Sequence, residues 1–243
     1  MARRGLSVEF VGLPGVGKSG VSRRLAEILK GQGFPVLETA YELTHLSGVA
    51  ARRLRKSAHI ARELARHPRY SGRSARAIGA TKQSSSKDLL GAIANWLFVS
   101  NLLRHDGRAP EIHLLDEGIF QALWSVGFSA ALDDLSSVAR DIGSDFPVPD
   151  VVVIVNASHA TVMQRLRARG VRQSRLEDRL GTDRGILERS DKLMRDVEKI
   201  LGGIAKTRRN VHIHEMANDR ENDLEPNARA LAGVLIPMFE GLR

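Results

Sequence analysis

The sequence contains no cysteine among its 243 residues. Disulfide bonds, thiolate metal sites and cysteine nucleophiles are therefore excluded. Long apolar runs are missing as well, since the first residues carry charge without the apolar stretch of a signal peptide. The strongest apolar run, Val151–Val155, is far too short to span a bilayer. These absences predict a cytoplasmic protein that does not enter a membrane.

Acidic residues are scarce relative to basic ones, with 28 Asp and Glu against 37 Lys and Arg and a formal net charge of +9. One basic cluster spans residues 52–82, in which Glu63 is the only acid, and a second spans residues 165–179. Nucleic acid, an anionic membrane surface or a polyphosphate substrate would each favour such a balance. Solvated helix faces are the alternative interpretation of both clusters.

The run Gly12–Ser19 follows the pattern Gly, four residues, Gly-Lys-Ser. Apolar residues precede it as in a strand, and apolar residues at helical spacing follow it. In such a loop the backbone N–H groups surround an anion, Lys18 reaches the outer phosphates, and the Ser19 hydroxyl can ligate Mg²⁺. We therefore predict a nucleoside triphosphate site formed by Gly12, Pro14, Gly15, Val16, Gly17, Lys18, Ser19 and Gly20.

Strand patterns and helix patterns alternate along the chain. The expected strands cover residues 6–11, 34–37, 112–115, 151–155 and 211–214. Such alternation predicts an α/β fold of three layers, with a parallel five-stranded sheet flanked by helices, in one domain over residues 1–243. A basic helical pattern covers residues 41–69, and His67–Ser74 is expected to break it.

Several polar residues stand at or just past the expected strand ends, where parallel sheets collect their ligands. The most informative is Asp116, which ends an apolar strand and is predicted to hold Mg²⁺ or to take the proton of the attacking group. Glu117 is open to two interpretations: it activates a water molecule, or it binds a hydroxyl or amine of an acceptor. The others are Gly12, Glu38, Asn156 and Glu215.

Arginines are concentrated after the fourth expected strand. Arg165 and Arg169 are four residues apart on one helix face, and Gly170 permits a break behind them. Arginines on a hinged segment can close over a triphosphate, neutralise charge on the transferred group and exclude water. The pattern predicts a lid.

The order of these motifs resembles the thymidylate kinase and deoxynucleoside kinase superfamily of phosphate-loop phosphotransferases. The resemblance implies a P-loop NTPase fold that uses ATP and Mg²⁺, with an acceptor-binding helical region at about 41–105 and an arginine-rich lid at about 165–185. Lys18, Ser19 and Asp116 would act on the phosphates and the metal, and Asp116 could also act as the base. The remaining implied roles are lid residues Arg165, Arg169 and Arg175, and acceptor-binding residues Glu38, Glu117 and Gln121.

Two departures from the family concern the acceptor. Thymidylate kinases carry Arg where this chain has Glu117, and Glu-Pro-Gly where it has Glu38-Thr39-Ala40. The expected function is transfer of the γ-phosphoryl group of ATP to a small molecule, either a nucleoside or nucleotide or an uncharged or cationic metabolite. The alternative is a P-loop NTPase that acts with nucleic acid or a protein partner. A homodimer is left open, and a nucleic acid partner is not the favoured expectation.

Overall fold

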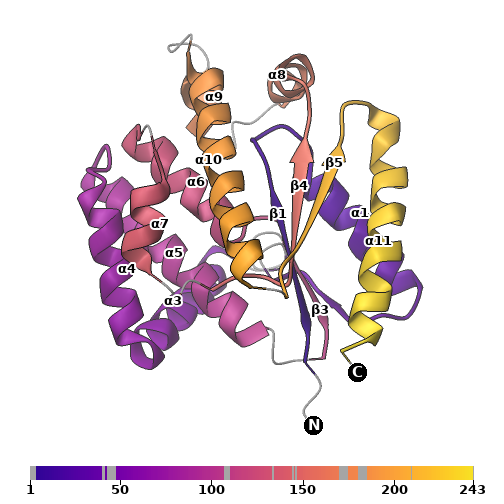
Figure 1. The fold of residues 1–243 in the computed structure, drawn as a ribbon, viewed down its shortest axis with the longest axis horizontal. Helices are drawn as coiled ribbons and strands as arrows, with labels where there is room; N and C mark the ends of the chain where they lie inside the picture. Colours follow the sequence, from indigo (N-terminus) through magenta and orange to yellow (C-terminus); the bar gives the residue numbers. More distant parts are fainter. Residues whose placement is uncertain are drawn as a thin grey trace.

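Five strands form the centre of the molecule, and helices pack on both sides of them (Figure 1). The computed structural model describes residues 4–39, 42, 48–106, 110–132, 134–143, 145, 147–169, 175–179, 185–208 and 210–242. The described elements, in chain order, are β1 (Leu6–Val11), α1 (Lys18–Gly31), β2 (Val36–Leu37), α3 (Val49–Arg66), α4 (Pro68–Ala80), α5 (Ser86–Asp106), β3 (Ile112–Leu115), α6 (Ile119–Ala130), α7 (Ser136–Ile142), β4 (Val151–Asn156), α8 (His159–Ala168), α9 (Arg175–Arg179), α10 (Ile186–Thr207), β5 (His212–Ala217), η2 (Glu221–Asp223) and α11 (Leu224–Glu240).

The sheet order places β1 in the middle. The strands run in the order β2-β3-β1-β4-β5, and every neighbouring pair is parallel. From β1 the chain moves to β2 and β3 on one side, and then crosses to β4 and β5 on the other. The carboxyl end of β1 is therefore a topological switch point, which is where open α/β sheets bind their ligands. The glycine-rich loop leaves β1 at this point.

The predicted parallel five-stranded sheet with helices on both sides is confirmed. Helices α1 and α11 pack together on one face, and α5, α6 and α10 lie on the other (Figure 1). Because both faces are covered, all six residues of β1 and the first five of β4 are buried. β4 accordingly has an uninterrupted apolar run, whereas in β1 the buried polar residues Ser7 and Glu9 alternate with apolar ones. Of the helices that the structure describes, none has the length and apolar character needed to cross a membrane.

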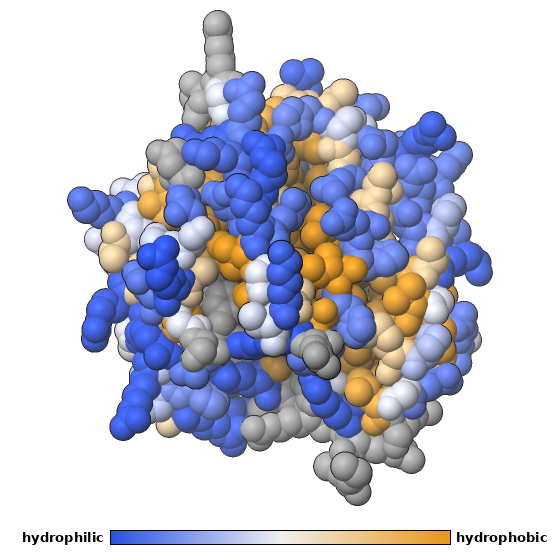
Figure 2. Space-filling view, in the orientation of Figure 1, coloured by the Kyte–Doolittle hydropathy of each residue, from blue (hydrophilic) through white to orange (hydrophobic). Residues whose placement is uncertain are grey.

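The edge strands differ from their predicted lengths. β5 continues to Ala217 because it pairs with β4 over six residues, so Glu215 lies within the strand and not beyond its end. Residue Ile213 of this edge strand is 39% exposed, and apolar atoms reach the surface among hydrophilic ones on the face seen in Figure 2. β2, at the opposite edge, contains only Val36 and Leu37.

The predicted interruption of the basic helical region is much shorter than expected. Helix α3 ends at Arg66 and α4 begins at Pro68, so only His67 separates them. Proline is well suited to the first helical position, because the N–H that it lacks would have no intrahelical acceptor there. The segment 68–74 is therefore the start of a second helix and not a break.

A buried carboxylate joins α3 to α5. Glu63 is fully buried, and its oxygens accept hydrogen bonds from Arg104 Nε at 3.1 Å and from Asn101 Nδ2 at 3.4 Å. The Oδ1 atom of Asn101 also lies 2.9 Å from Nδ1 of His59, one turn earlier in α3. The guanidinium of Arg104 stacks over the Tyr70 ring of α4, with its carbon 4.7 Å from the ring centroid. This cluster fixes the packing of the three helices.

We predict that Glu63→Ala lowers the free energy of unfolding by about 3 kcal/mol, because it leaves Arg104 without its carboxylate partner in a largely buried site. Urea unfolding followed by circular dichroism measures the change. Glu63→Gln, which keeps the shape and two polar atoms, should cost clearly less. Equal losses from the two variants would contradict the assigned role of the charge.

Candidate functional site

The loop between β1 and α1 has a backbone that only glycine adopts easily. Gly15 and Gly17 have φ values of +94° and +97°. A Cβ atom on Gly12 would lie 2.4 Å from the Val155 carbonyl oxygen, and one on Gly17 would lie 2.3 Å from Asn218 Nδ2. Left-handed φ and these close approaches explain the glycines of the motif. Lys18, Ser19 and Gly20 form the first turn of α1, and Pro14 and Val16 lie in the loop.

Neighbouring elements hold the loop by hydrogen bonds. The amide side chain of Gln121, on α6, accepts a hydrogen bond from Gly12 N–H at 3.2 Å. The Val16 carbonyl accepts two, from Asn218 Nδ2 at 2.7 Å and from Arg165 Nη1 at 2.9 Å. Arg165 Nη1 also donates to the Asn218 carbonyl at 2.8 Å. Three segments that follow β3, β4 and β5 thus fix one loop, which prearranges it for an anion.

Two of these three residues were assigned other contacts from the sequence. Gln121 was expected to bind an acceptor, and Arg165 to act in the lid, yet the described contacts of both include the loop itself. Asn218 was missed altogether. The only sequence signal for it is its place just after the last strand, and that strand ends three residues later than predicted.

Lys18 lies against the loop from which α1 starts. Its Nζ donates hydrogen bonds to the carbonyl oxygens of Gly12, at 2.6 Å, and Leu13, at 3.1 Å. Burial lowers the pKa of this ammonium to about 8, and the charge of Arg169 acts in the same direction. The carboxylates of Glu117 and Asp116 act in the opposite direction. The ammonium is therefore close to both carboxylates that follow β3.

Asp116 directly follows β3 and meets the start of α1. Ser19 Oγ donates a hydrogen bond to Asp116 Oδ2 at 3.3 Å. A hydroxyl and a carboxylate are hard oxygen donors of the kind that bind Mg²⁺ together with phosphate oxygens and water. Among the described residues, no group of three or more His, Asp or Glu side chains could hold a metal ion by itself. The other ligands of a Mg²⁺ at this pair would be phosphate oxygens or water.

Glu117, the next residue, lies among charges of both signs. Burial raises its pKa above the ordinary value, and the neighbouring Asp116 carboxylate raises it further. Lys18 and Lys56 act in the opposite direction. Lys56 extends from α3, where its Nζ donates to Asn95 Oδ1 at 3.2 Å and lies 5.0 Å from the centroid of the Phe98 ring. The helical region therefore brings a cation to the side of the site on which Glu117 lies.

The turn that carries both carboxylates is anchored on β1. Glu9 is fully buried, and its carboxylate accepts hydrogen bonds from the backbone N–H groups of Ile119, Phe120 and Gln121 at 3.0, 2.7 and 3.0 Å. It thereby satisfies the first N–H groups of α6, which have no acceptor within the helix. Burial raises the pKa of Glu9 to about 8, while the three hydrogen bonds lower it. No pattern in the sequence indicates this contact.

The predicted lid is described only in part. Arg169 follows α8, and its Nη1 lies 3.9 Å from Glu177 Oε1 in α9. Arg175 begins α9, but its side chain lies outside the described residues, as do residues 170–174 and 180–184. The structure therefore places one of the three predicted lid arginines beside α9, another on the loop, and only the backbone of the third.

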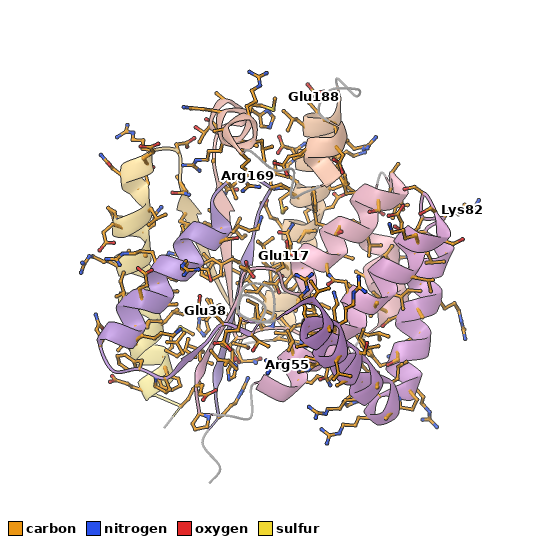
Figure 3. All side chains as sticks on the ribbon, turned by 180° about the vertical axis from the view of Figure 1, so that it is seen from behind. Glu38, Arg55, Lys82, Glu117, Arg169 and Glu188 are labelled. Carbon is orange, nitrogen blue, oxygen red and sulfur yellow. The ribbon has the colours of Figure 1, made fainter. Side chains whose placement is uncertain are left out.

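Glu38 lies away from the loop. Because Leu37 pairs with His113, Glu38 is level with Leu114 and hence with Val8, four residues before Gly12 and about 13 Å along the strand. Its carboxylate accepts a hydrogen bond from Lys30 Nζ at 2.9 Å. Glu38 and Glu117 are both labelled in Figure 3. The register thus separates Glu38 from the loop, while it leaves Glu38 only two residue levels before Asp116.

The chain was compared with protein families, with curated sequences and with solved structures. No protein-family model and no curated protein sequence matches the chain. The chain is similar to the crystal structure of thymidylate kinase from Ehrlichia chaffeensis, with 14% identity, a TM-score of 0.48 and coverage of 95% of this chain and 98% of that chain. A similarity at this level assigns neither a family nor an activity to the chain.

We predict that Gly118→Ala lowers the free energy of unfolding by about 2 kcal/mol, because the added Cβ would lie 2.2 Å from Glu9 Cδ. Gly91→Ala is the matched control, since no atom lies within 4 Å of that added Cβ on α5. The control should be neutral or stabilising by up to about 1 kcal/mol. Thermal and urea unfolding check both. Equal stability of the two variants would mean that Glu9 does not pack beneath the turn.

Proposed function

We propose that the protein is an ATP-dependent phosphotransferase, which moves the γ-phosphoryl group to a hydroxyl of a small molecule. The observation that carries the proposal is the meeting of Lys18, Ser19 and Asp116 at the switch point, on a loop held open by glycines and by contacts from three segments. Backbone N–H groups at the start of α1 face the same side as the loop, which suits a polyphosphate.

The donor side is assigned to the loop and the residues around it. Gly15, Gly17 and the first turn of α1 would surround the phosphates with N–H groups, and the Lys18 ammonium would exchange its carbonyl contacts for phosphate oxygens. Ser19 and Asp116 would hold Mg²⁺, which neutralises charge on the phosphates when bound. Arg165 would position the loop through the Val16 carbonyl. Arg169 and Arg175 would neutralise the transferred group from the lid.

The acceptor side is assigned to Glu117 and the helical region. The acceptor oxygen forms a bond to the γ-phosphorus, the bond from that phosphorus to the β-phosphate oxygen breaks, and ADP leaves. The hydroxyl proton goes to the Glu117 carboxylate, whose raised pKa makes it a better base than an ordinary glutamate. Asp116 is already engaged by Ser19, which is the reason for giving the proton to Glu117.

A panel of acceptors tests this assignment. ATP turnover with Mg²⁺ is measured alone and with nucleosides, nucleoside monophosphates, sugars and aminoglycosides. We expect product with one acceptor class and a loss of turnover of about 100-fold or more in Glu117→Gln, with little change in the KM for ATP. Asp116→Asn should also lower turnover. The exposed Glu240→Gln on α11 serves as the control and should match the unaltered protein.

The alternative function is hydrolysis of a nucleoside triphosphate with nucleic acid or a protein as partner. It predicts a different result in the same assay, namely turnover that does not depend on an acceptor. Steady hydrolysis that no acceptor changes, and that Glu117→Gln abolishes, would make Glu117 the residue that orients water. Such an outcome would overturn the phosphotransferase proposal and leave the nucleotide site in place.

The pKa of Lys18 predicts that nucleotide binding is coupled to proton uptake. Folded protein without nucleotide loses the Lys18 proton above about pH 8, whereas phosphate oxygens favour the charged ammonium. Affinity for ATP should therefore fall as pH rises through about 8. Calorimetry at about pH 8.5, in buffers of different ionisation enthalpy, should show uptake that Lys18→Arg removes. Binding without proton uptake in the unaltered protein would contradict the assignment.

A further inference from the structure

The whole excess of positive charge belongs to one pair of helices. Ten of the 37 Lys and Arg residues lie within residues 49–82, together with one of the 28 Asp and Glu residues. The remainder of the chain holds 27 of each sign and is formally neutral. The segment comprises α3, α4 and the two residues that follow them, so the net charge of the protein is a local feature of this hairpin.

Most of these cations are exposed. Six arginines of α3 and α4 are exposed to solvent, and no ion pair joins any of them to an acid in the described part of the chain. α3 lies on the near side of the molecule in Figure 3, where Arg55 and Lys82 are labelled. By contrast, Arg73 pairs with Asp145, and the half-buried Lys56 faces Glu117. Around α3, Arg55, Arg62 and Arg66 lie within about 40° of one another, whereas Arg53 lies about 180° from Arg62. We call these three, together with Arg69 and Arg76 of α4, the arginine surface.

Nothing in the fold of the described residues accounts for the arginine surface. The buried charge of α3 is Glu63, which Arg104 of α5 already satisfies. Like charges on one helix hairpin repel one another and lower stability. The candidate nucleotide site is formed by other residues, which lie at the carboxyl ends of β1 and β3. An unpaired array of this kind therefore points to an external polyanion.

The pattern of exposed apolar residues indicates which class of polyanion the arginines suit. On α3 the large exposed ones are Val49, Leu54 and Leu64. Leu54 and Leu64 are ten residues apart, about 15 Å along the helix, and no aromatic residue occurs in α3. An interfacial membrane helix needs a continuous stripe of large apolar side chains, and single-stranded nucleic acid needs aromatic platforms. The backbone of a duplex needs neither, because cations alone release its counterions.

We propose that the arginine surface binds the phosphate backbone of a nucleic acid duplex without reading its sequence. α3 has 18 residues and is about 27 Å long, so it can follow the backbone over several phosphates. About four phosphate contacts give a logarithmic salt slope near −3.6, which is an affinity loss of about a hundredfold between about 50 and 200 mM salt. The proposal does not depend on the phosphotransferase assignment.

The test is binding of a fluorescent DNA duplex of about 20 base pairs to the full chain, followed by anisotropy at several salt concentrations. The variant Arg55→Glu, Arg62→Glu, Arg66→Glu should weaken binding at least tenfold and flatten the salt slope. The control reverses three exposed cations on α10, Arg195→Glu, Lys199→Glu and Lys206→Glu, and changes net charge by the same amount. It should stay within about threefold of the unaltered protein. Thermal unfolding verifies that both variants fold.

Three results would overturn the proposal. Equal weakening by the two triple variants would show that net charge attracts the duplex without a defined surface. Absence of duplex binding at about 50 mM salt, together with binding to phosphatidylserine vesicles, would assign the surface to a membrane. Absence of both would show that it does not take a polyanion. An intact nucleotide site in each case would separate these outcomes from failure of the proposed function.

Discussion

A buried carboxylate on the central strand ties the two halves of the candidate site together. Glu9 lies in β1, three residues before the glycine-rich loop, and its oxygens accept the first three N–H groups of α6. The same helix supplies Gln121, which accepts the hydrogen bond of Gly12. The loop and the carboxylate turn are therefore positioned by one strand and one helix. A shift of α6 would move Asp116, Glu117 and the loop together.

The charges of Lys18, Asp116 and Glu117 determine which ligands the candidate site can bind. One ammonium, Lys18, lies near two adjacent carboxylates, and burial disfavours the charged form of Lys18 and of Glu117. A polyphosphate with a divalent cation would supply both signs at once, negative charge for Lys18 and positive charge for Asp116. An anion without a cation would meet the repulsion of both carboxylates. The same balance makes a phosphate-bearing acceptor a poor fit beside Glu117, unless Lys56 of α3 compensates for it.

The sequence was sufficient for the features that depend on local pattern. Apolar strand patterns, the alternation with helices and the glycine loop predicted the sheet, and the structure has Ser19 hydrogen-bonded to Asp116, which directly follows β3. Contacts between distant segments could not be predicted from local patterns, because Glu9, Asn218 and Arg165 are 110, 202 and 149 residues from their partners. The bounds of the edge strands were predicted incorrectly for a related reason. The lengths of β2 and β5 are set by their single neighbours, so Glu215 lies within its strand and not past its end, while Glu38 directly follows β2 as expected.

Helix α3 contributes residues both to the proposed phosphotransferase site and to the arginine surface. Its inner side presents Lys56 toward Glu117 and Glu63 toward α5, and its outer side carries arginines that no described acid pairs with. If the excess charge served the nucleotide alone, it would be concentrated around the loop, yet the chain outside residues 49–82 is formally neutral. The field of the hairpin decays within about 10 Å at moderate salt, so its exposed side acts mainly on what approaches from solvent. A site balanced in charge and a surface far from balance thus share one helix, on which they occupy different sides.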